Sequence, residues 1–211
     1  MDSSDIQRRL RLGLFVQPLG HHVSGWRLTD NAGSPTDIDW LITLAKKAEA
    51  GTFDLFFVGD ALATSMYRLP STMARLEPLT LLSALAVHTR RIGLAATAST
   101  TFSDPFTLAR SLSSLDHISR GRAAWNVVTS FSNDVARNFS RDDMPDHAQR
   151  YGRAREFLDV ASKLWNGWEE GAVQPDADSG RYFVDEKIKA VNHRGEHFQV
   201  QGPLNITRSP Q

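Results

Sequence analysis

The chain has 211 residues, of which 41% are hydrophobic and 23% charged, and its 24 basic and 24 acidic residues give a formal net charge of +0. These proportions are typical of a globular protein, and the lack of a basic surplus argues against a dedicated nucleic-acid-binding protein. Because the sequence has no cysteine, disulfides, thiolate catalysis and cysteine-ligated metal centres are excluded.

No apolar run in the sequence has the length of a signal peptide or a membrane span. We therefore expect a cytoplasmic protein that binds neither membrane nor nucleic acid.

Four short, mostly apolar segments predict strands that are buried on both faces. They lie at residues 10–17, 53–60, 91–100 and 122–130. Helical patterns follow each of them, at residues 36–52, 77–91, 104–121 and 146–168. Asp37 (or Thr36) and Asp104 stand where N-caps belong, and Gly51 and Gly121 stand where the helices should stop.

The regular alternation of strand and helix predicts an α/β protein with a parallel sheet. The strands start roughly every 30–40 residues, which is the length of a βα unit with its crossover helix. Hydrophobic periodicity alone leaves two architectures open, a barrel and a doubly wound sheet.

From Glu169 onward the pattern changes to turn residues with short possible strands such as "HFQV". We expect residues 169–200 to form an insertion or hairpin region within a single domain of residues 1–211. Four βα units without closure would leave two free sheet edges, and a homo-oligomer is one way to cover them.

Polar side chains stand at the ends of the predicted strands, where ligands of parallel α/β folds bind. Asp60 ends the second strand, "TASTTFSD" ends the third, and "GRAAWNVVTS" ends in Asn126, Thr129 and Ser130. Such neutral donors and acceptors suit a heterocycle with carbonyl and N–H edges better than a hard metal ion. The alternative is that these hydroxyls bind no ligand and are polar only because strand ends contact water.

The histidines invite two further interpretations. His147 and Tyr151 are four residues apart and share a face if the last helix has begun. His193 and His197 have a helical ligand spacing, but Gly195 between them makes a helix, and hence a metal site, unfavourable, so we predict none.

Several segments together resemble the flavin-dependent, bacterial-luciferase-like monooxygenases, in particular the nitrilotriacetate and dibenzothiophene-sulfone monooxygenase subgroup. The stretches that carry the resemblance are "LGLFVQPLGHHVSGWR", "FDLFFVGD", "EPLTLLSALAVHTRRIGLAATASTTFSDPFTLARSLSSLDHISRGRAAWNVVTS", "HAQRYGRAREFLDV" and "HRGEHFQVQGPLNITRSPQ". They span nearly the whole chain in the family's order.

The resemblance implies a TIM-type (β/α)8 barrel, here truncated to about its first four βα units, that binds reduced FMN at the mouth of the barrel. A separate NAD(P)H:flavin reductase would supply the FMNH2. The family's flavin contacts fall on Asp60, Thr97, Ser99, Asn126, His147 and Tyr151. His21 or His22 would lie near the reacting edge of the ring, and His147 would have a catalytic role.

The implied reaction inserts one oxygen of O2 into a small organic substrate through a flavin C4a-hydroperoxide. Members of the family are about twice as long, and their phosphate-gripping loop belongs to the later strands. The alternative interpretation is therefore a non-catalytic remnant of such an enzyme. A deazaflavin-dependent reductase on the same barrel is disfavoured by the segment "WNVVTS".

Overall fold

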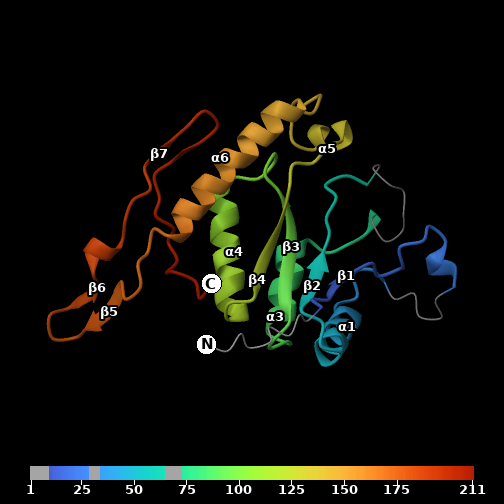
Figure 1. Cartoon of the computed structure of the whole chain (residues 1–211), viewed down its shortest axis with the longest axis horizontal. Coiled ribbons are helices and arrows are strands. Elements are labelled where there is room, and N and C mark those ends of the chain that lie inside the picture. The colour runs from blue at the N-terminus through green and yellow to red at the C-terminus, as the bar shows by residue number, and fades with distance from the viewer. Residues whose placement is uncertain (1–9, 29–33, 65–72) are drawn as a thin grey trace, which may run out of the picture.

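The computed structural model describes residues 10–28, 34–64 and 73–211, and its centre is a parallel sheet (Figure 1). The four strands of this sheet are β1 (Gly13–Phe15), β2 (Leu55–Val58), β3 (Gly93–Ser99) and β4 (Ala123–Val128). Each lies inside one of the four predicted strand segments, so those predictions are confirmed.

Helices follow the strands as the caps predicted. They are α1 (Ile38–Ala50), α3 (Pro78–Ala86), α4 (Pro105–Ser119), the short α5 (Asn133–Arg137) and α6 (His147–Trp165). The carboxylates of Asp37, Asp104 and Asp146 each accept a backbone N–H in the first turn of α1, α4 and α6, respectively.

Two details of the helices differ from the prediction. The stop signal of α4 is Arg120, which adopts the left-handed conformation (φ 62°) one residue before the expected Gly121. The short helix α5 was not predicted, because its five residues are too few for a periodic pattern.

The strand order resolves the choice between barrel and doubly wound sheet. All pairings are parallel and the spatial order is β1-β2-β3-β4, the same as the order along the chain. A doubly wound sheet reverses direction at a switch point, whereas a barrel adds each strand beside the last. The described part of the sheet follows the barrel pattern.

The distribution of the core agrees with a barrel wall. Alternate strand residues pack with the helices in two clusters, which include Phe56, Val58, Leu94, Ala96 and Ala123. The intervening residues, among them Phe57, Thr97 and Asn126, point to the opposite face and are absent from those clusters. Helices thus cover one face, and the other face corresponds to a barrel interior.

Residues 169–200, expected as an insertion or hairpin region, contain two antiparallel hairpins. The first joins β5 (Val173–Asp176) to β6 (Arg181–Phe183) and projects from the body of the molecule (Figure 1). The second joins β7 (His193–Arg194) to β8 (Gln199–Val200) and is anchored on α6 through Glu156. No helix in the described ranges is long and apolar enough to cross a membrane.

Candidate active site

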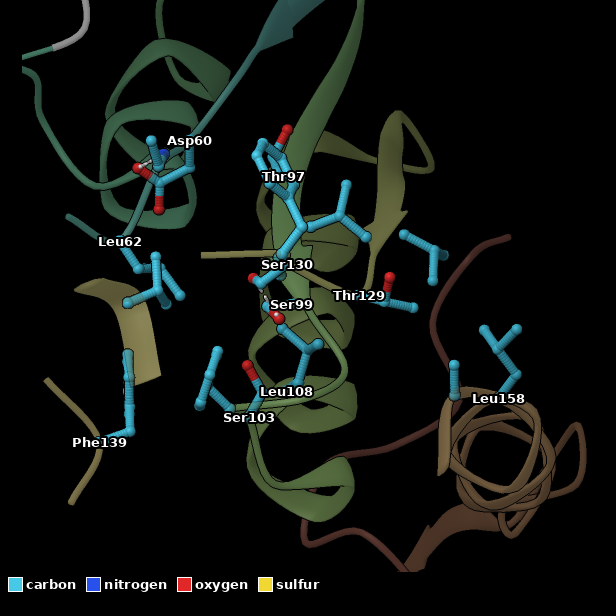
Figure 2. Close-up of a pocket in the computed structure, with 18 of the residues that line it drawn as sticks. Asp60, Leu62, Thr97, Ser99, Ser103, Leu108, Thr129, Ser130, Phe139 and Leu158 are labelled. Atoms are coloured by element: carbon cyan, nitrogen blue, oxygen red, sulfur yellow. Dashed lines mark hydrogen bonds between the residues drawn. The ribbon is translucent and has the colours of Figure 1, made fainter. Parts of the chain in front are cut away.

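A cavity of about 620 Å³ opens at the carboxyl ends of β2, β3 and β4 (Figure 2). Its polar lining includes the hydroxyls of Thr97, Ser99, Ser103, Thr129 and Ser130. Its apolar lining includes Leu62, Phe102, Leu108, Val128, Phe131, Phe139 and Leu158. In Figure 2, Asp60, Leu62 and Phe139 lie on one side of this space, and Leu158 lies across from them beyond β3 and β4.

The polar residues of β3 and of the end of β4 form hydrogen-bonded pairs. The Asn126 Nδ2 donates to Thr97 Oγ1 over 3.0 Å, and the Ser130 hydroxyl donates to Ser99 Oγ over 2.9 Å. Thr97 and Ser99 are buried, and the register that places Thr97 opposite Asn126 brings the first pair together. The polar ends of these strands therefore satisfy one another. Thr97, Ser99 and Ser130 also line the cavity, whereas the predicted residue Asn126 is not part of its described lining.

Ser130 holds an unusual backbone conformation at this edge, with φ at 55°. The left-handed backbone conformation is energetically unfavourable for residues other than glycine, and such strain is concentrated at functional sites. Its carbonyl accepts a hydrogen bond from Arg150, and its hydroxyl is held by Ser99. These contacts on both sides fix the turn that carries the chain out of β4.

Asp60 follows β2 and lines the cavity, as predicted from its position in the sequence. Its Oδ1 accepts the Ala61 N–H over 2.8 Å. Burial raises the pKa of the Asp60 carboxyl above its ordinary value, while the Ala61 N–H and the charge of Arg75 act in the opposite direction. The preceding residue must be small, because a Cβ on Gly59 would lie 2.7 Å from the Phe15 ring.

His147 and Tyr151 occupy the first turns of α6 and stack on each other, with ring centroids 4.3 Å apart. Tyr151 lines the cavity, whereas His147 is exposed just outside its lining. The two predicted residues are thus brought together at the rim.

His21 and His22 lie in the loop after β1 and are both exposed. The His21 ring is 6.3 Å from the ring of Phe15, and His22 Nδ1 accepts the Ser24 N–H. Neither histidine contributes to the cavity lining given by the described residues. Their predicted place near a reacting edge stays a prediction.

His193 and His197 are used to anchor the β7–β8 hairpin. The Glu156 carboxylate accepts hydrogen bonds from His193 Nε2 at 2.9 Å and from the backbone N–H groups of His197 and Phe198. Within residues 10–28, 34–64 and 73–211, no cluster of histidine and acidic side chains has the arrangement of a metal site.

Two arginines near the site were missed by the sequence analysis. Arg150 binds the Ser130 carbonyl, and Arg153 binds the carbonyls of Thr100 and Ser103. For Arg150 a usable signal was present, because cations are disfavoured in the first turn of a helix, where the dipole is positive. Arg153 lies in the second turn of α6, where this signal does not apply.

A family model described as luciferase-like monooxygenase matches residues 19–211. The chain belongs to the luciferase-like monooxygenase family. The match includes β2, β3, β4 and α6, so all the residues that line the cavity lie within the matched region.

Individual luciferase-like relatives support the same assignment. The chain is 46% identical to N-acetyl-S-(2-succino)cysteine monooxygenase of Bacillus subtilis, over 97% of this chain and 47% of that protein. It is 43% identical to nitrilotriacetate monooxygenase component A of Aminobacter aminovorans, over 97% of this chain and 48% of that protein. The predicted subgroup is therefore confirmed, and the chain spans about half the length of the curated relatives it matches.

A solved structure of riboflavin lyase, which contains modified FMN and riboflavin, matches with a TM-score of 0.86 and 31% identity. The match covers 97% of this chain and 48% of that one. The four βα units of this luciferase-like chain thus have the arrangement found in about half of that enzyme.

Proposed function

We propose that this chain forms the flavin-holding part of an FMNH2-dependent monooxygenase that inserts one oxygen atom of O2 into a small organic substrate. The observation that carries the proposal is the cavity at the carboxyl ends of β2 to β4, whose lining includes five residues with hydroxyl groups and Tyr151 at the rim, together with the charged residues Asp60, Glu77 and Arg155. Membership of the luciferase-like family and the riboflavin lyase structure with FMN support the choice of cofactor.

The cavity suits a flavin ring in its chemistry. An isoalloxazine has apolar faces and one edge of carbonyl and N–H groups, so it needs apolar walls and a few neutral hydrogen-bonding partners. Thr97, Ser99 and Ser130 would supply the partners, and Leu62, Val128 and Phe139 would supply walls. Asn126 is not itself part of the lining, and we propose that its amide oxygen reaches the ring from beside Thr97, to which its Nδ2 donates.

Reduced FMN, when bound, supplies the oxygen chemistry of the reaction. The work of the protein is to orient the ring, exclude water and handle protons. Tyr151 would pack at the rim over the ring, and His147, stacked on Tyr151, would exchange a proton through its imidazole nitrogen. Asp60 would hydrogen-bond to the flavin from the end of β2.

The proposal includes a partner that makes the reduced cofactor. The resemblance to two-component monooxygenases implies that another protein reduces the flavin. The Aminobacter relative is named as component A, which indicates a system of more than one component. We propose a separate NAD(P)H:flavin reductase as the other component.

Titration with FMN tests the cofactor assignment. The purified chain should quench flavin fluorescence and shift its absorbance with an affinity in about the micromolar range, which corresponds to roughly −8 kcal/mol. Asn126→Leu should weaken binding by about tenfold, the effect of one hydrogen bond lost beside a buried ring. Its melting temperature should change little by comparison.

Two results would count against this function. A chain that fails to bind FMN even at about millimolar concentration, where binding is worth only about −4 kcal/mol, would favour the remnant interpretation. An Asn126→Leu variant with unchanged flavin affinity and a lowered melting temperature would place this amide in the core only.

A further inference from the structure

Arg153 lies on α6, outside the cavity lining, and its side chain extends to the turn that follows β3. Its Nε donates to the carbonyl of Thr100 over 3.1 Å, and its Nη2 donates to the carbonyl of Ser103 over 3.2 Å. These two acceptors bracket the turn that follows β3. Among the described residues Arg153 forms no ion pair within 4.0 Å, so the acceptors of its guanidinium are backbone carbonyls.

The turn held by Arg153 is part of the candidate site. Ser99 lines the cavity and accepts the Ser130 hydroxyl, and Ser103 lines it as well. The N–H groups of Thr101 and Ser103 both donate to Ser99, to its Oγ and its carbonyl, respectively. The position of Ser99 therefore depends on the conformation of the turn.

The other face of Arg153 is covered by the β7–β8 hairpin. Its guanidinium carbon lies 4.2 Å from the centroid of the Phe198 ring, a cation–π contact with a half-buried arginine. Burial lowers the pKa of the Arg153 guanidinium below its ordinary value. A guanidinium stacked on one side and hydrogen-bonded in its plane has little freedom to rotate.

Glu156 fixes the hairpin that carries Phe198. Its carboxylate, one turn along α6 from Arg153, accepts the N–H of Phe198 over 2.9 Å and the N–H of His197 over 3.0 Å. His193 Nε2 binds the same carboxylate from the opposite strand of the hairpin. A continuous set of contacts thus leads from residues 193–198 through Arg153 to the turn after β3, where Ser103 lines the cavity.

We propose that Arg153 is a positioning residue for the flavin pocket, and that the β7–β8 hairpin acts on the pocket through it by clamping Phe198 against the guanidinium. The inference rests on the proposed function, because it assigns the hairpin a role in ligand binding by the same cavity. It gives residues 193–200, which lie outside the cavity lining, a defined effect on the site.

Amide hydrogen exchange and FMN affinity, measured together on the whole chain, test the proposal. In Arg153→Lys one charge remains, but the planar pair of hydrogen bonds and the stacked contact are lost. The Thr101 and Ser103 amides should exchange at least about fivefold faster, and FMN should bind about fivefold to tenfold more weakly, as for the loss of a charged hydrogen bond. Phe198→Leu leaves Arg153 in place. It should also speed up amide exchange and weaken FMN binding, but by smaller factors than Arg153→Lys.

The matched control is Arg194→Gln in the same hairpin. Arg194 is exposed, and its side chain has no hydrogen bond or ion pair to the described residues. This substitution should alter neither quantity. Combining Arg153→Lys with Phe198→Leu should weaken FMN binding by less than the product of the single effects, because the two side chains act as one unit.

Unchanged exchange of Thr101 and Ser103 in either variant would overturn the coupling. Faster exchange with unaltered FMN affinity would reduce Arg153 to a structural residue and equally overturn the proposal. A wild-type chain that fails to bind FMN overturns the proposed function itself, a result distinguishable from both because it appears before any substitution is made.

Discussion

At the scale of single residues, the site is built from polar groups that satisfy one another across strands. Thr97 and Asn126 pair between β3 and β4, and Ser99 pairs with Ser130 just beyond β4. A buried hydroxyl without a partner would cost about 1–3 kcal/mol, so these pairs let a cavity carry polar groups without weakening the sheet. Asp60 differs from them, because it is a partly buried carboxylate.

Asp60→Asn should separate stability from binding. Because burial raises the folded-state pKa of Asp60 above its ordinary value of 3.8, its ionised form opposes folding at neutral pH. The amide can still accept the Ala61 N–H, so the variant should equal or exceed the wild type in stability at pH 7. This advantage should vanish as the pH falls below the unfolded-state pKa, where both residues are neutral.

The flavin affinity of Asp60→Asn should fall by about tenfold, the typical effect of losing a hydrogen bond to a charged group. Chemical denaturation at several pH values, beside an FMN titration, measures both effects. A variant that is less stable than the wild type at pH 7 and binds FMN normally would make Asp60 a local cap.

At the scale of elements, α6 connects the parts of the molecule. Its first turns present Tyr151 to the cavity and Arg150 to the Ser130 carbonyl. Further along, Arg153 holds the turn after β3, and Glu156 holds the β7–β8 hairpin. Residues three or four apart on a helix lie close together but point in slightly different directions, so one helix can serve three neighbours.

The left-handed residue that ends α4 offers a test at this scale. Arg120 is exposed and has φ at 62° and ψ at 53°. The N–H of the next residue, Gly121, donates to the Asp116 carbonyl in the last turn of α4. Glycine adopts this conformation without the Cβ clash that costs about 1 kcal/mol or more for other residues. Arg120→Gly should therefore unfold at a higher temperature than Arg120→Ala.

The comparison of glycine with alanine isolates the backbone, because both substitutions remove the same charge. We expect a difference of about 1 kcal/mol, or roughly 2–4 °C in melting temperature for a chain of this size. Equal melting temperatures for the two variants would mean that α4 ends differently in solution.

At the scale of the whole molecule, the sheet has two strands with an unpaired edge within the described residues. β1 pairs with β2 alone, and β4 pairs with β3 alone. Val127 on β4 is 39% exposed, and Phe131 beyond it is 65% exposed. Free, apolar edges of this kind promote association between chains.

We therefore expect the 211-residue polypeptide on its own to self-associate as its concentration rises. Val127→Lys should suppress the association while leaving the far-ultraviolet circular dichroism unchanged, because an edge lysine opposes strand pairing. The control is Val87→Lys, a substitution of the same kind at a 70% exposed position after α3, away from the edge. Sedimentation velocity that shows a monomer at all concentrations would contradict the expectation.

Much of the architecture was predictable because its determinants are local. Apolar runs marked the four strands, and Asp37 and Asp104 marked the starts of two helices, since an N-cap bonds to N–H groups two or three residues away. The candidate site was predictable in part. Asp60, Thr97, Ser99 and Tyr151 line the cavity, whereas the other predicted residues do not belong to the described lining: Asn126, His147, His21 and His22.

The sequence by itself determined the alternation of strand and helix, the polar ends of the strands and the resemblance to a family. Only the tertiary structure decided the barrel-type strand order, the pairing of Asn126 with Thr97, and the partners of Arg153 and Glu156. The reason is physical: these partners lie 29 to 53 residues apart along the chain. Which groups meet over such separations depends on sheet register and helix packing, and neither leaves a periodic trace in the sequence.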